Sequence, residues 1–264
     1  MGKIIAVTNQ KGGVGKTTSS INIAASLAAT KRKVLLVDLD PQGNASSGCG
    51  VDKDELEIHI LDVLMGEKSA HECMINAEQA GIYIIPANSD LAAAEAHLLN
   101  ADHKESRLKS ALLPLVDEFD YIFIDCPPSL SILTVNALVA ANSVMIPMQC
   151  EYYALEGLSA LLNTIGQITE HVNPDLTIEG ILRTMYDPRN RLAVEVSGQL
   201  HEHFGEKVYR TVIPRNVRLA EAPSYGLPAL LYDRLSRGAK AYLALAGEMI
   251  RRQESEAEAN SSVA

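Results

Sequence analysis

The 264-residue sequence lacks the features that mark membrane-bound and secreted proteins. It contains no apolar stretch near the roughly 20 residues that a helix needs to cross a bilayer. The opening residues, Met1-Gly2-Lys3, run directly into an apolar segment, so we expect no signal peptide. These absences predict a cytoplasmic protein that has no direct membrane anchor.

Cysteines and histidines are present, but not in the patterns that hold metals or form disulfides. The four cysteines are scattered and include no C-x-x-C pair, which favours free thiols in a reducing cytoplasm. The seven histidines show no ligand spacing either. The sequence therefore argues against a disulfide-stabilised or transition-metal protein.

What the sequence does contain is a glycine-rich segment between a predicted strand and a predicted helix. Residues 11–18 follow the apolar run 4–7 and precede the helical pattern 21–28. This is the context of a phosphate-binding loop, whose backbone N–H groups and helix N-terminus surround an anion. Lys16 is expected to reach the phosphates of ATP, and the Thr17 hydroxyl to ligate Mg²⁺. The other predicted ATP-binding residues of the loop are Lys11, Gly12, Gly13, Val14, Gly15 and Thr18.

The loop departs from the usual Walker A spacing at its start. Gln10 stands where that motif has its first glycine, and a second lysine, Lys11, follows it. A lysine at the loop entrance is poorly aimed at the nucleotide of its own chain. We therefore predict that Lys11 stabilises phosphate charge on the nucleotide of a second subunit, as an arginine finger does. Gly12 would permit the close backbone approach that this requires.

Apolar runs alternate with helical patterns along the chain, and most of the runs are continuously apolar, as in strands covered on both faces. The predicted strands are residues 3–8, 33–39, 81–86, 120–125, 143–149, 177–184 and 207–213. Further helices are predicted at residues 91–99, 154–171 and 238–252. No repeat or linker divides the chain. We therefore predict a single α/β domain over residues 1–252, a P-loop NTPase with a mostly parallel twisted sheet covered by helices on both faces. A disordered acidic tail is expected at residues 253–264.

Two further predicted strands end in aspartates, at the edge where parallel sheets bind their ligands. Asp125 follows an apolar run and is predicted to hold Mg²⁺ through a water. Asp40 is predicted to orient the attacking water, with Asp38 second, as support for the loop or the metal shell. A turn at residues 40–43 and a helix cap at Asp125 remain the alternative interpretations.

Charge is distributed unevenly in this acidic chain. The net charge is −10, yet residues 181–240 carry ten Lys/Arg against six Asp/Glu, a local charge of +4. Screening confines electrostatic attraction to about 10 Å, so a local basic face can bind DNA on an acidic protein. The distribution is compatible with nucleic-acid binding.

Five segments together resemble the ParA/MinD family of deviant Walker A ATPases, and within it the ParA/Soj branch. They are residues 11–18, 38–44, 125–129, 149–158 and 221–226. The resemblance implies an ATP hydrolase whose ATP-bound homodimer binds double-stranded DNA without sequence preference. It implies chromosome or plasmid partitioning at the nucleoid, with a ParB-type centromere-binding partner that stimulates hydrolysis. Catalytic roles are implied for Lys11, Lys16 and Asp40.

The resemblance also implies contacts outside the phosphate loop. Pro214 and Asn216 match the adenine-contacting loop of the family, although a strand-ending turn is the alternative. Arg189 and Arg218 match its DNA-contacting residues, with Arg215 as a weaker candidate; ordinary solvated arginines are the alternative.

Three other functions stay open at this point. A ParA-like ATPase that positions a non-DNA cargo would share every motif above. A MinD-like membrane-cycling ATPase would need a basic amphipathic C-terminal helix, which the acidic residues 253–264 do not resemble. An electron-transfer ATPase like the nitrogenase iron protein would need cluster-ligating cysteines, and Cys126 matches no such motif.

Overall fold

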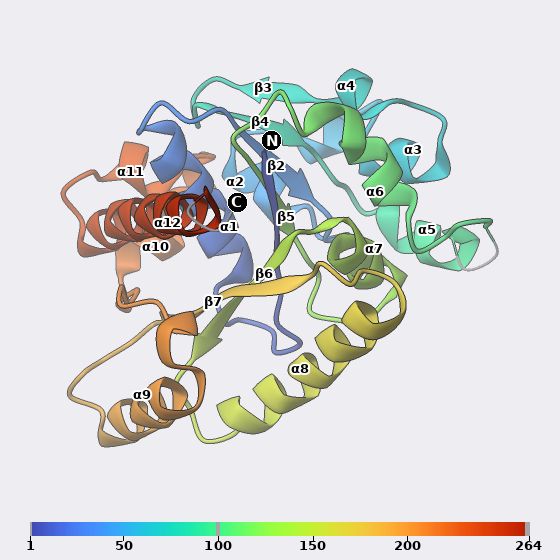
Figure 1. The fold of residues 1–264 in the computed structure, drawn as a ribbon. Coiled ribbons are helices and arrows are strands. Elements are labelled where there is room, and N and C mark those ends of the chain that lie inside the picture. Colours follow the sequence, from blue (N-terminus) through green and yellow to red (C-terminus); the bar gives the residue numbers. More distant parts are fainter. Residues whose placement is uncertain (1, 99–100, 262–264) are drawn as a thin grey trace.

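A seven-stranded sheet forms the centre of the computed structural model, which describes residues 2–98 and 101–261 (Figure 1). The strand order is β3-β4-β2-β5-β1-β6-β7, and all neighbours are parallel except the antiparallel pair β3 and β4. The strands are β1 (Lys3–Val7), β2 (Val34–Asp38), β3 (Ile75–Ala77), β4 (Ile82–Ile85), β5 (Tyr121–Asp125), β6 (Ser143–Gln149) and β7 (Thr177–Thr184). The predicted parallel α/β fold is confirmed.

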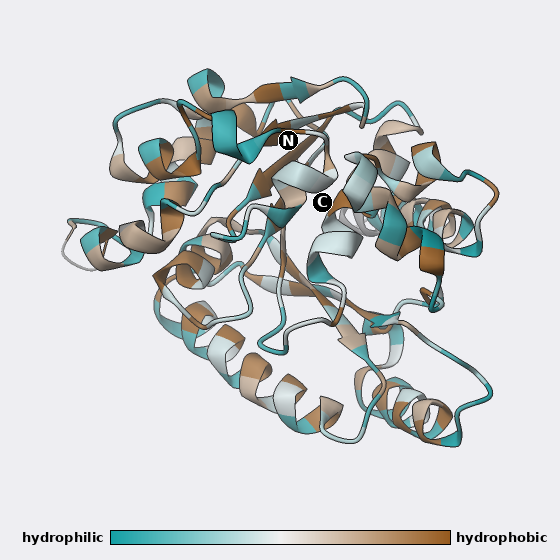
Figure 2. Cartoon of the chain, turned by 180° about the vertical axis from the view of Figure 1, so that it is seen from behind, coloured by the Kyte–Doolittle hydropathy of each residue, from teal (hydrophilic) through white to brown (hydrophobic). Residues whose placement is uncertain are grey.

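Helices cover both faces of the sheet because successive strand residues point to opposite sides. In β1, Ile4 and Ala6 belong to one core, and Ile5 and Val7 to the other. Figure 2 shows hydrophobic colour along the strands and hydrophilic colour in many of the outer loops and helix faces. The first core is covered by α3 (Ile60–Met65), α4 (Ala70–Cys73), α5 (Leu91–Leu98), α6 (Arg107–Leu112), α7 (Ile132–Ala140), α8 (Ala154–His171) and α9 (Arg191–Phe204). The second is covered by α1 (Lys16–Ala28), α2 (Asn44–Gly48), α10 (Val217–Glu221), α11 (Ala229–Tyr232) and α12 (Arg237–Ser261).

Four short 3₁₀ helices complete the described secondary structure. They are η1 (Lys53–Glu55), η2 (Leu113–Leu115), η3 (Gly205–Lys207) and η4 (Ala222–Tyr225). In the ranges that the structure describes, no helix combines the length and the apolar content that a membrane crossing requires.

The predicted strands differ from the observed strands in two places: one observed strand was not predicted, and one predicted strand does not form. The short edge strand β3 was not predicted, because three residues with an exposed Asn76 in the middle give no apolar run. Residues 207–213, which were predicted as a strand, form none. This segment meets β7 through an isolated bridge between Val208 and Ile181.

Side chains explain why residues 207–213 do not join the sheet as a strand. The Glu248 carboxylate accepts the backbone N–H groups of Arg210 and Thr211 at 2.8 and 2.9 Å. The Arg183 guanidinium donates to the backbone carbonyls of Tyr209 and Arg210 at 2.7 and 3.2 Å. These bonds satisfy backbone groups that a strand ladder would otherwise pair. The apolar pattern of the segment reflects burial rather than sheet pairing.

The C-terminal helix is longer than the sequence predicted. It was expected to end at residue 252 before a disordered tail, but α12 continues to Ser261, and residues 262–264 lie outside the described part. Alanine, glutamate and glutamine are good helix formers, so this polar stretch can extend a helix that is already anchored. The Tyr121 hydroxyl also donates a hydrogen bond to the Gln253 side chain.

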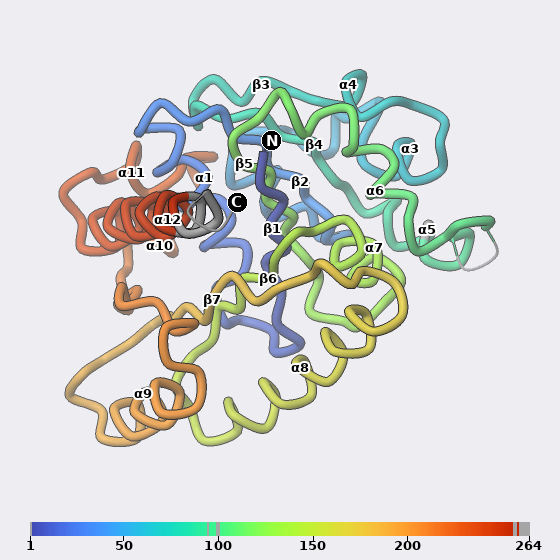
Figure 3. Tube along the Cα trace, viewed as in Figure 1, coloured from blue at the N-terminus to red at the C-terminus, as the bar shows by residue number. Residues whose placement is uncertain are grey.

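Helix α12 packs along α1, the helix that follows the glycine-rich loop (Figure 3). The hydroxyl groups of Ser19 and Tyr242 are hydrogen-bonded at 3.0 Å, and both side chains are buried. The C-terminal helix therefore supports the element on which the predicted phosphate site is built.

Candidate nucleotide-binding site

The order of the strands brings the predicted phosphate loop and the predicted aspartates to one edge of the sheet. β5 lies between β1 and β2, with Asp125 opposite Val7 on one side and Asp38 on the other. All three strands are parallel, so their carboxyl ends meet there. Residues 8–15 leave β1 at this edge and lead into α1.

Two glycines and an asparagine shape the loop. Gly13 and Gly15 have φ angles of 71° and 88°, a left-handed conformation that L side chains rarely adopt. The Asn9 side chain accepts the N–H of Lys11 at 3.0 Å and donates to the carbonyl of Pro147 at 2.8 Å. Asn9 is not among the residues predicted from the sequence, because its partner on β6 lies 138 residues away.

The loop is also anchored to β7. The Thr184 hydroxyl donates to the backbone carbonyl of Val14 at 2.7 Å. No sequence motif pointed to Thr184, whose contact with the loop arises only from the placement of β7 in the sheet.

The two loop lysines have different surroundings. Lys16 is only 7% exposed, and its ammonium group donates to the backbone carbonyl of Lys11 at 3.3 Å. Burial lowers the pKa of Lys16, while the negative charges of Asp125 and Asp40 act in the opposite direction. The ammonium group of Lys11 is instead ion-paired with the half-exposed carboxylate of Glu151, in the segment after β6. Lys16 thus lies against the loop, whereas Lys11 points out of it.

Asp125 is a fully buried carboxylate, and one of its oxygens has no hydrogen-bond partner among the described residues. Ser20 donates to its Oδ1 at 2.8 Å, whereas Oδ2 makes no hydrogen bond with the described residues. Burial, reinforced by the charge of Asp38, raises the pKa of Asp125 to about 7, and the nearby Thr17 and Ser20 hydroxyls counteract part of this rise. A hard oxygen ligand set of this kind suits Mg²⁺.

No group of three or more His, Cys, Asp or Glu side chains gathers for metal binding in the described residues. Mg²⁺ commonly keeps several waters and binds one or two protein groups together with substrate phosphates. Thr17 and Asp125 therefore fit a magnesium ion that arrives with a nucleotide.

The two aspartates after β2 have different environments. Asp38 is buried and accepts the N–H and the hydroxyl of Ser46, both at 2.8 Å, and the N–H of Asp40 at 3.2 Å. Burial raises the pKa of Asp38 to about 6. Asp40 accepts the N–H of Gln42 at 2.9 Å and is close enough to Lys16 for its charge to raise that pKa. These contacts favour loop support by Asp38 and leave Asp40 near Lys16, the lysine that is predicted to bind phosphate.

The predicted adenine loop lies next to the end of β7. Pro214 forms an isolated bridge with Tyr186, two residues past β7. Asn216 caps α10 by accepting the N–H of Arg218 at 3.0 Å. A capping role does not exclude a contact with adenine, so Pro214 and Asn216 stay predictions.

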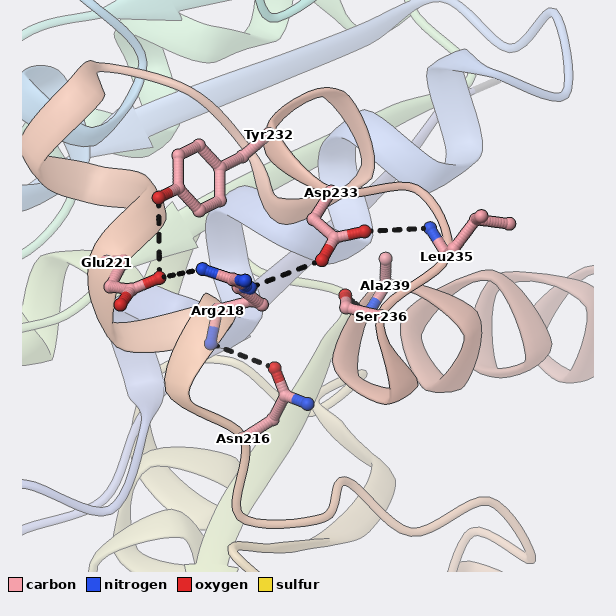
Figure 4. A network of polar contacts seen from close by, with 8 residues as sticks. All are labelled: Asn216, Arg218, Glu221, Tyr232, Asp233, Leu235, Ser236 and Ala239. Atoms are coloured by element: carbon pink, nitrogen blue, oxygen red, sulfur yellow. Dashed lines mark hydrogen bonds and ion pairs between the residues drawn. The ribbon is translucent and has the colours of Figure 1, made fainter.

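The predicted DNA-contacting arginines lie on the surface. Figure 4 shows Arg218 between two acidic residues: it donates to Glu221 at 2.8 Å and lies 3.3 Å from Asp233. The Tyr232 hydroxyl also donates to Glu221, at 3.3 Å.

Arg189 and Arg215 differ from Arg218 in their surroundings. Arg189 pairs with Asp187 at 2.8 Å, which lowers the pKa of Asp187 to about 2. Arg215 is exposed and has no ion-pair partner in the described ranges. None of the three is buried, so each is accessible to a ligand.

Comparisons with known proteins show which sequences and structures this chain is similar to. The family model described as an AAA domain matches residues 2–178. The sporulation initiation inhibitor protein Soj of Bacillus subtilis is 54% identical over 94% of this chain and 98% of its own length. The chromosome partitioning protein ParA of Myxococcus xanthus is 51% identical over 96% of this chain and 89% of its own length.

A solved structure from Mycobacterium smegmatis matches the fold with a TM-score of 0.85 and 38% identity over 97% of both chains. It is described as cobyrinic acid a,c-diamide synthase with a bound ATP analogue and magnesium.

Proposed function

This chain belongs to the ParA/Soj family of partitioning ATPases, and on that premise we propose that it segregates DNA by ATP-dependent dimerisation. It is an ATP hydrolase that uses ATP and Mg²⁺. In the proposed cycle the ATP-bound homodimer holds double-stranded DNA without sequence preference at the nucleoid, in the cytoplasm. A ParB-type partner at a centromere-like site stimulates hydrolysis and releases the dimer.

The nucleotide is proposed to bind in the loop of residues 11–18. Lys16 and the loop N–H groups hold the phosphates, while Thr17 and Asp125, the latter through a water, would hold Mg²⁺. The bound ion would neutralise phosphate charge as it develops. Asp40 orients the attacking water, since phosphoryl transfer depends mainly on positioning and charge stabilisation.

Dimerisation is proposed to depend on Lys11. Its ammonium group points away from the loop and forms an ion pair with Glu151. Both side chains are nearly half exposed, at 46% and 44%, and exposed ion pairs contribute only about 0–1 kcal/mol. A triphosphate on a second copy can therefore compete with Glu151 for this lysine.

DNA binding is proposed for Arg189, Arg215 and Arg218. All three belong to the segment 181–240, whose charge is +4 in an otherwise acidic chain. The ion pairs of Arg189 and Arg218 are exposed, so phosphates can displace the carboxylates at small cost. Contacts of this kind with phosphates give salt-sensitive binding without sequence preference.

Positioning of a non-DNA cargo is the second candidate, because such an ATPase would keep every feature of the nucleotide site. The description of the Mycobacterium smegmatis structure names a diamide synthase, and this activity is less well supported for the present chain. The two partitioning relatives share 51% and 54% identity with this chain, against 38% for that structure.

The observation that carries the proposal is that the loop contains two lysines in different surroundings. Lys16 is buried, whereas the ammonium group of Lys11, at the loop entrance, is half-exposed and paired with Glu151. The test is a DNA-binding titration with ATP, with ADP and without nucleotide, on two unrelated duplex sequences. We expect binding only with ATP and equal affinity for both duplexes. Binding that is absent with ATP, or equal in all three states, would contradict the proposal.

A further inference from the structure

The contact between Thr184 and Val14 links the phosphate loop to a distant strand. Thr184 is the last residue of β7, and its hydroxyl donates to the Val14 carbonyl at 2.7 Å across 170 residues of sequence. Thr184 is 2% exposed and Val14 is 1% exposed, so water does not compete for either group. The hydrogen bond therefore fixes the direction of one carbonyl in the middle of the loop.

The direction of this carbonyl also sets the direction of a neighbouring N–H. Val14 and Gly15 share a peptide group, and the described chain contains no cis peptide bond. In a planar trans peptide the C=O and N–H bonds point in opposite directions. With the Val14 carbonyl held toward Thr184, the Gly15 N–H points away from β7.

This peptide group has an alternative orientation, because glycine follows it. Gly15 has a φ of 88°, and glycine adopts positive and negative φ with similar ease. Rotation of the peptide would turn the Gly15 N–H toward β7 and the Val14 carbonyl away from it, toward the side on which the nucleotide is proposed to bind. A carbonyl oxygen in that place would repel a phosphate.

Packing at Gly15 is compatible with this anchoring. A Cβ at Gly15 would lie 3.7 Å from the Thr184 methyl carbon, so the strand residue contacts the loop at the peptide concerned. The methyl group and the hydroxyl of Thr184 thus both face this part of the loop.

We propose that Thr184 is a positioning residue for nucleotide binding: its hydroxyl holds the Val14–Gly15 peptide so that the Gly15 N–H is directed at a phosphate of MgATP. The proposal rests on the nucleotide site described above. Thr184 acts through the loop backbone and does not itself touch the nucleotide.

The test replaces Thr184 by residues that keep either its shape or its donor. Thr184→Val keeps the shape and removes the hydroxyl, which leaves the buried Val14 carbonyl without a partner. We expect the Kd and the KM for MgATP to rise about tenfold, the factor that corresponds to about 1.4 kcal/mol. The kcat should stay within about threefold, because the N–H binds phosphate in the substrate complex as well as in the transition state. Thr184→Ser keeps the donor and should stay near wild type.

A matched control is available on the same strand. The Thr177 hydroxyl, at the other end of β7, donates to the Asn142 carbonyl at 3.3 Å, and Thr177 is exposed. Thr177→Val makes the same chemical change far from the loop and should leave the MgATP affinity unchanged. If Thr184→Val does not fold, Thr184→Ser and Thr184→Ala serve as the pair, because they differ only by the hydroxyl.

Titration of each variant with MgATP, alongside steady-state kinetics, decides the question. Weaker binding by the variants without the hydroxyl and near-normal binding by Thr184→Ser would support the proposal. Equal affinity for all variants, or equal loss in Thr184→Ser and Thr184→Val, would overturn it. If the wild type itself bound no MgATP, the proposed nucleotide site would fail as well, so the two failures are distinguishable.

Discussion

The ammonium group of Lys11 and the carboxylate of Glu151 form an ion pair that joins the entrance of the phosphate loop to the segment after β6. The pair holds the ammonium group of Lys11 at Glu151, whereas the side chain of Lys16 is buried and its ammonium group donates to the loop backbone. Two lysines only five residues apart thus differ in their surroundings, as the proposed roles on two different nucleotides require.

The variant Lys11→Gln tests this division of roles. Because Lys16 and the loop backbone remain, we expect MgATP to bind with near wild-type affinity. The ATP-dependent dimer should be lost, and hydrolysis should fall by about 10³–10⁵-fold, the range measured for arginine fingers. Light scattering with a non-hydrolysable ATP analogue and a phosphate-release assay measure the two effects. Lys109→Gln, an exposed charge change on α6, is the control. Normal dimerisation of Lys11→Gln would refute the role across the interface.

The variant Asp40→Ala tests the water-positioning role. The loss of a positioned general base typically lowers the rate by about 10²–10⁴-fold. We expect ATP binding and dimerisation to persist, so the variant should accumulate as an ATP-bound dimer on size-exclusion chromatography. Asp54→Ala, at an exposed position in η1, should behave as wild type. Unchanged turnover by Asp40→Ala would exclude Asp40 from this role.

Substitution of the surface arginines tests the DNA interface. The double variant Arg189→Glu/Arg218→Glu should dimerise with ATP but no longer retain DNA. In a milder variant, Arg215→Gln, the slope of log affinity against log salt should decrease by about 0.9, the value for one phosphate contact. Lys109→Gln, an exposed charge change on α6 outside residues 181–240, should leave the slope unchanged. Retention of DNA by the double variant at moderate salt would show that the interface lies elsewhere.

The buried carboxylates predict a pH dependence of stability in magnesium-free buffer. Burial raises the pKa of Asp125 to about 7, well above its ordinary value of 3.8, so the folded state holds an extra proton between these two values. Because the folded state binds more protons there than the unfolded state, the free energy of unfolding decreases as the pH rises from about 4 to about 7. The neutral carboxyl stabilises the fold at low pH, and this contribution is lost on ionisation.

Urea unfolding of wild type and Asp125→Asn at pH 5 and pH 7 measures this contribution. We expect the wild type to lose more stability than the variant between the two pH values, by an amount on the order of 1–3 kcal/mol, since one pKa unit corresponds to about 1.4 kcal/mol. Identical changes in both proteins would show that Asp125 is already ionised at pH 5.

Local patterns were sufficient to predict most of the sheet and the loop between β1 and α1. Continuous apolar runs located β1, β2 and β4 through β7, and the glycine spacing located the loop before α1. Both signals lie within a few consecutive residues. The contacts of Asn9 with β6 and of Thr184 with the loop join residues 138 and 170 positions apart, so no local pattern encodes them.

The wrong predictions have similar causes. Residues 207–213 have the composition of a strand, but the distant side chains of Arg183 and Glu248 bind their backbone groups. The last helix was predicted to end at residue 252, whereas helix propensity and the contact of Gln253 with Tyr121 favour its continuation, and α12 ends at Ser261. Tertiary partners decided the first segment, and local helix propensity together with one tertiary contact decided the second.

The packing of α12 on α1 has a consequence for synthesis on the ribosome. One of the first helices to emerge, residues 16–28, is covered by one of the last, residues 237–261, so a face of α1 stays unprotected until nearly the whole chain has been translated. At about 5–20 residues per second this wait lasts on the order of 10–50 s. The apolar residues of α1 that α12 covers in the folded chain therefore lack their final packing partner for that time.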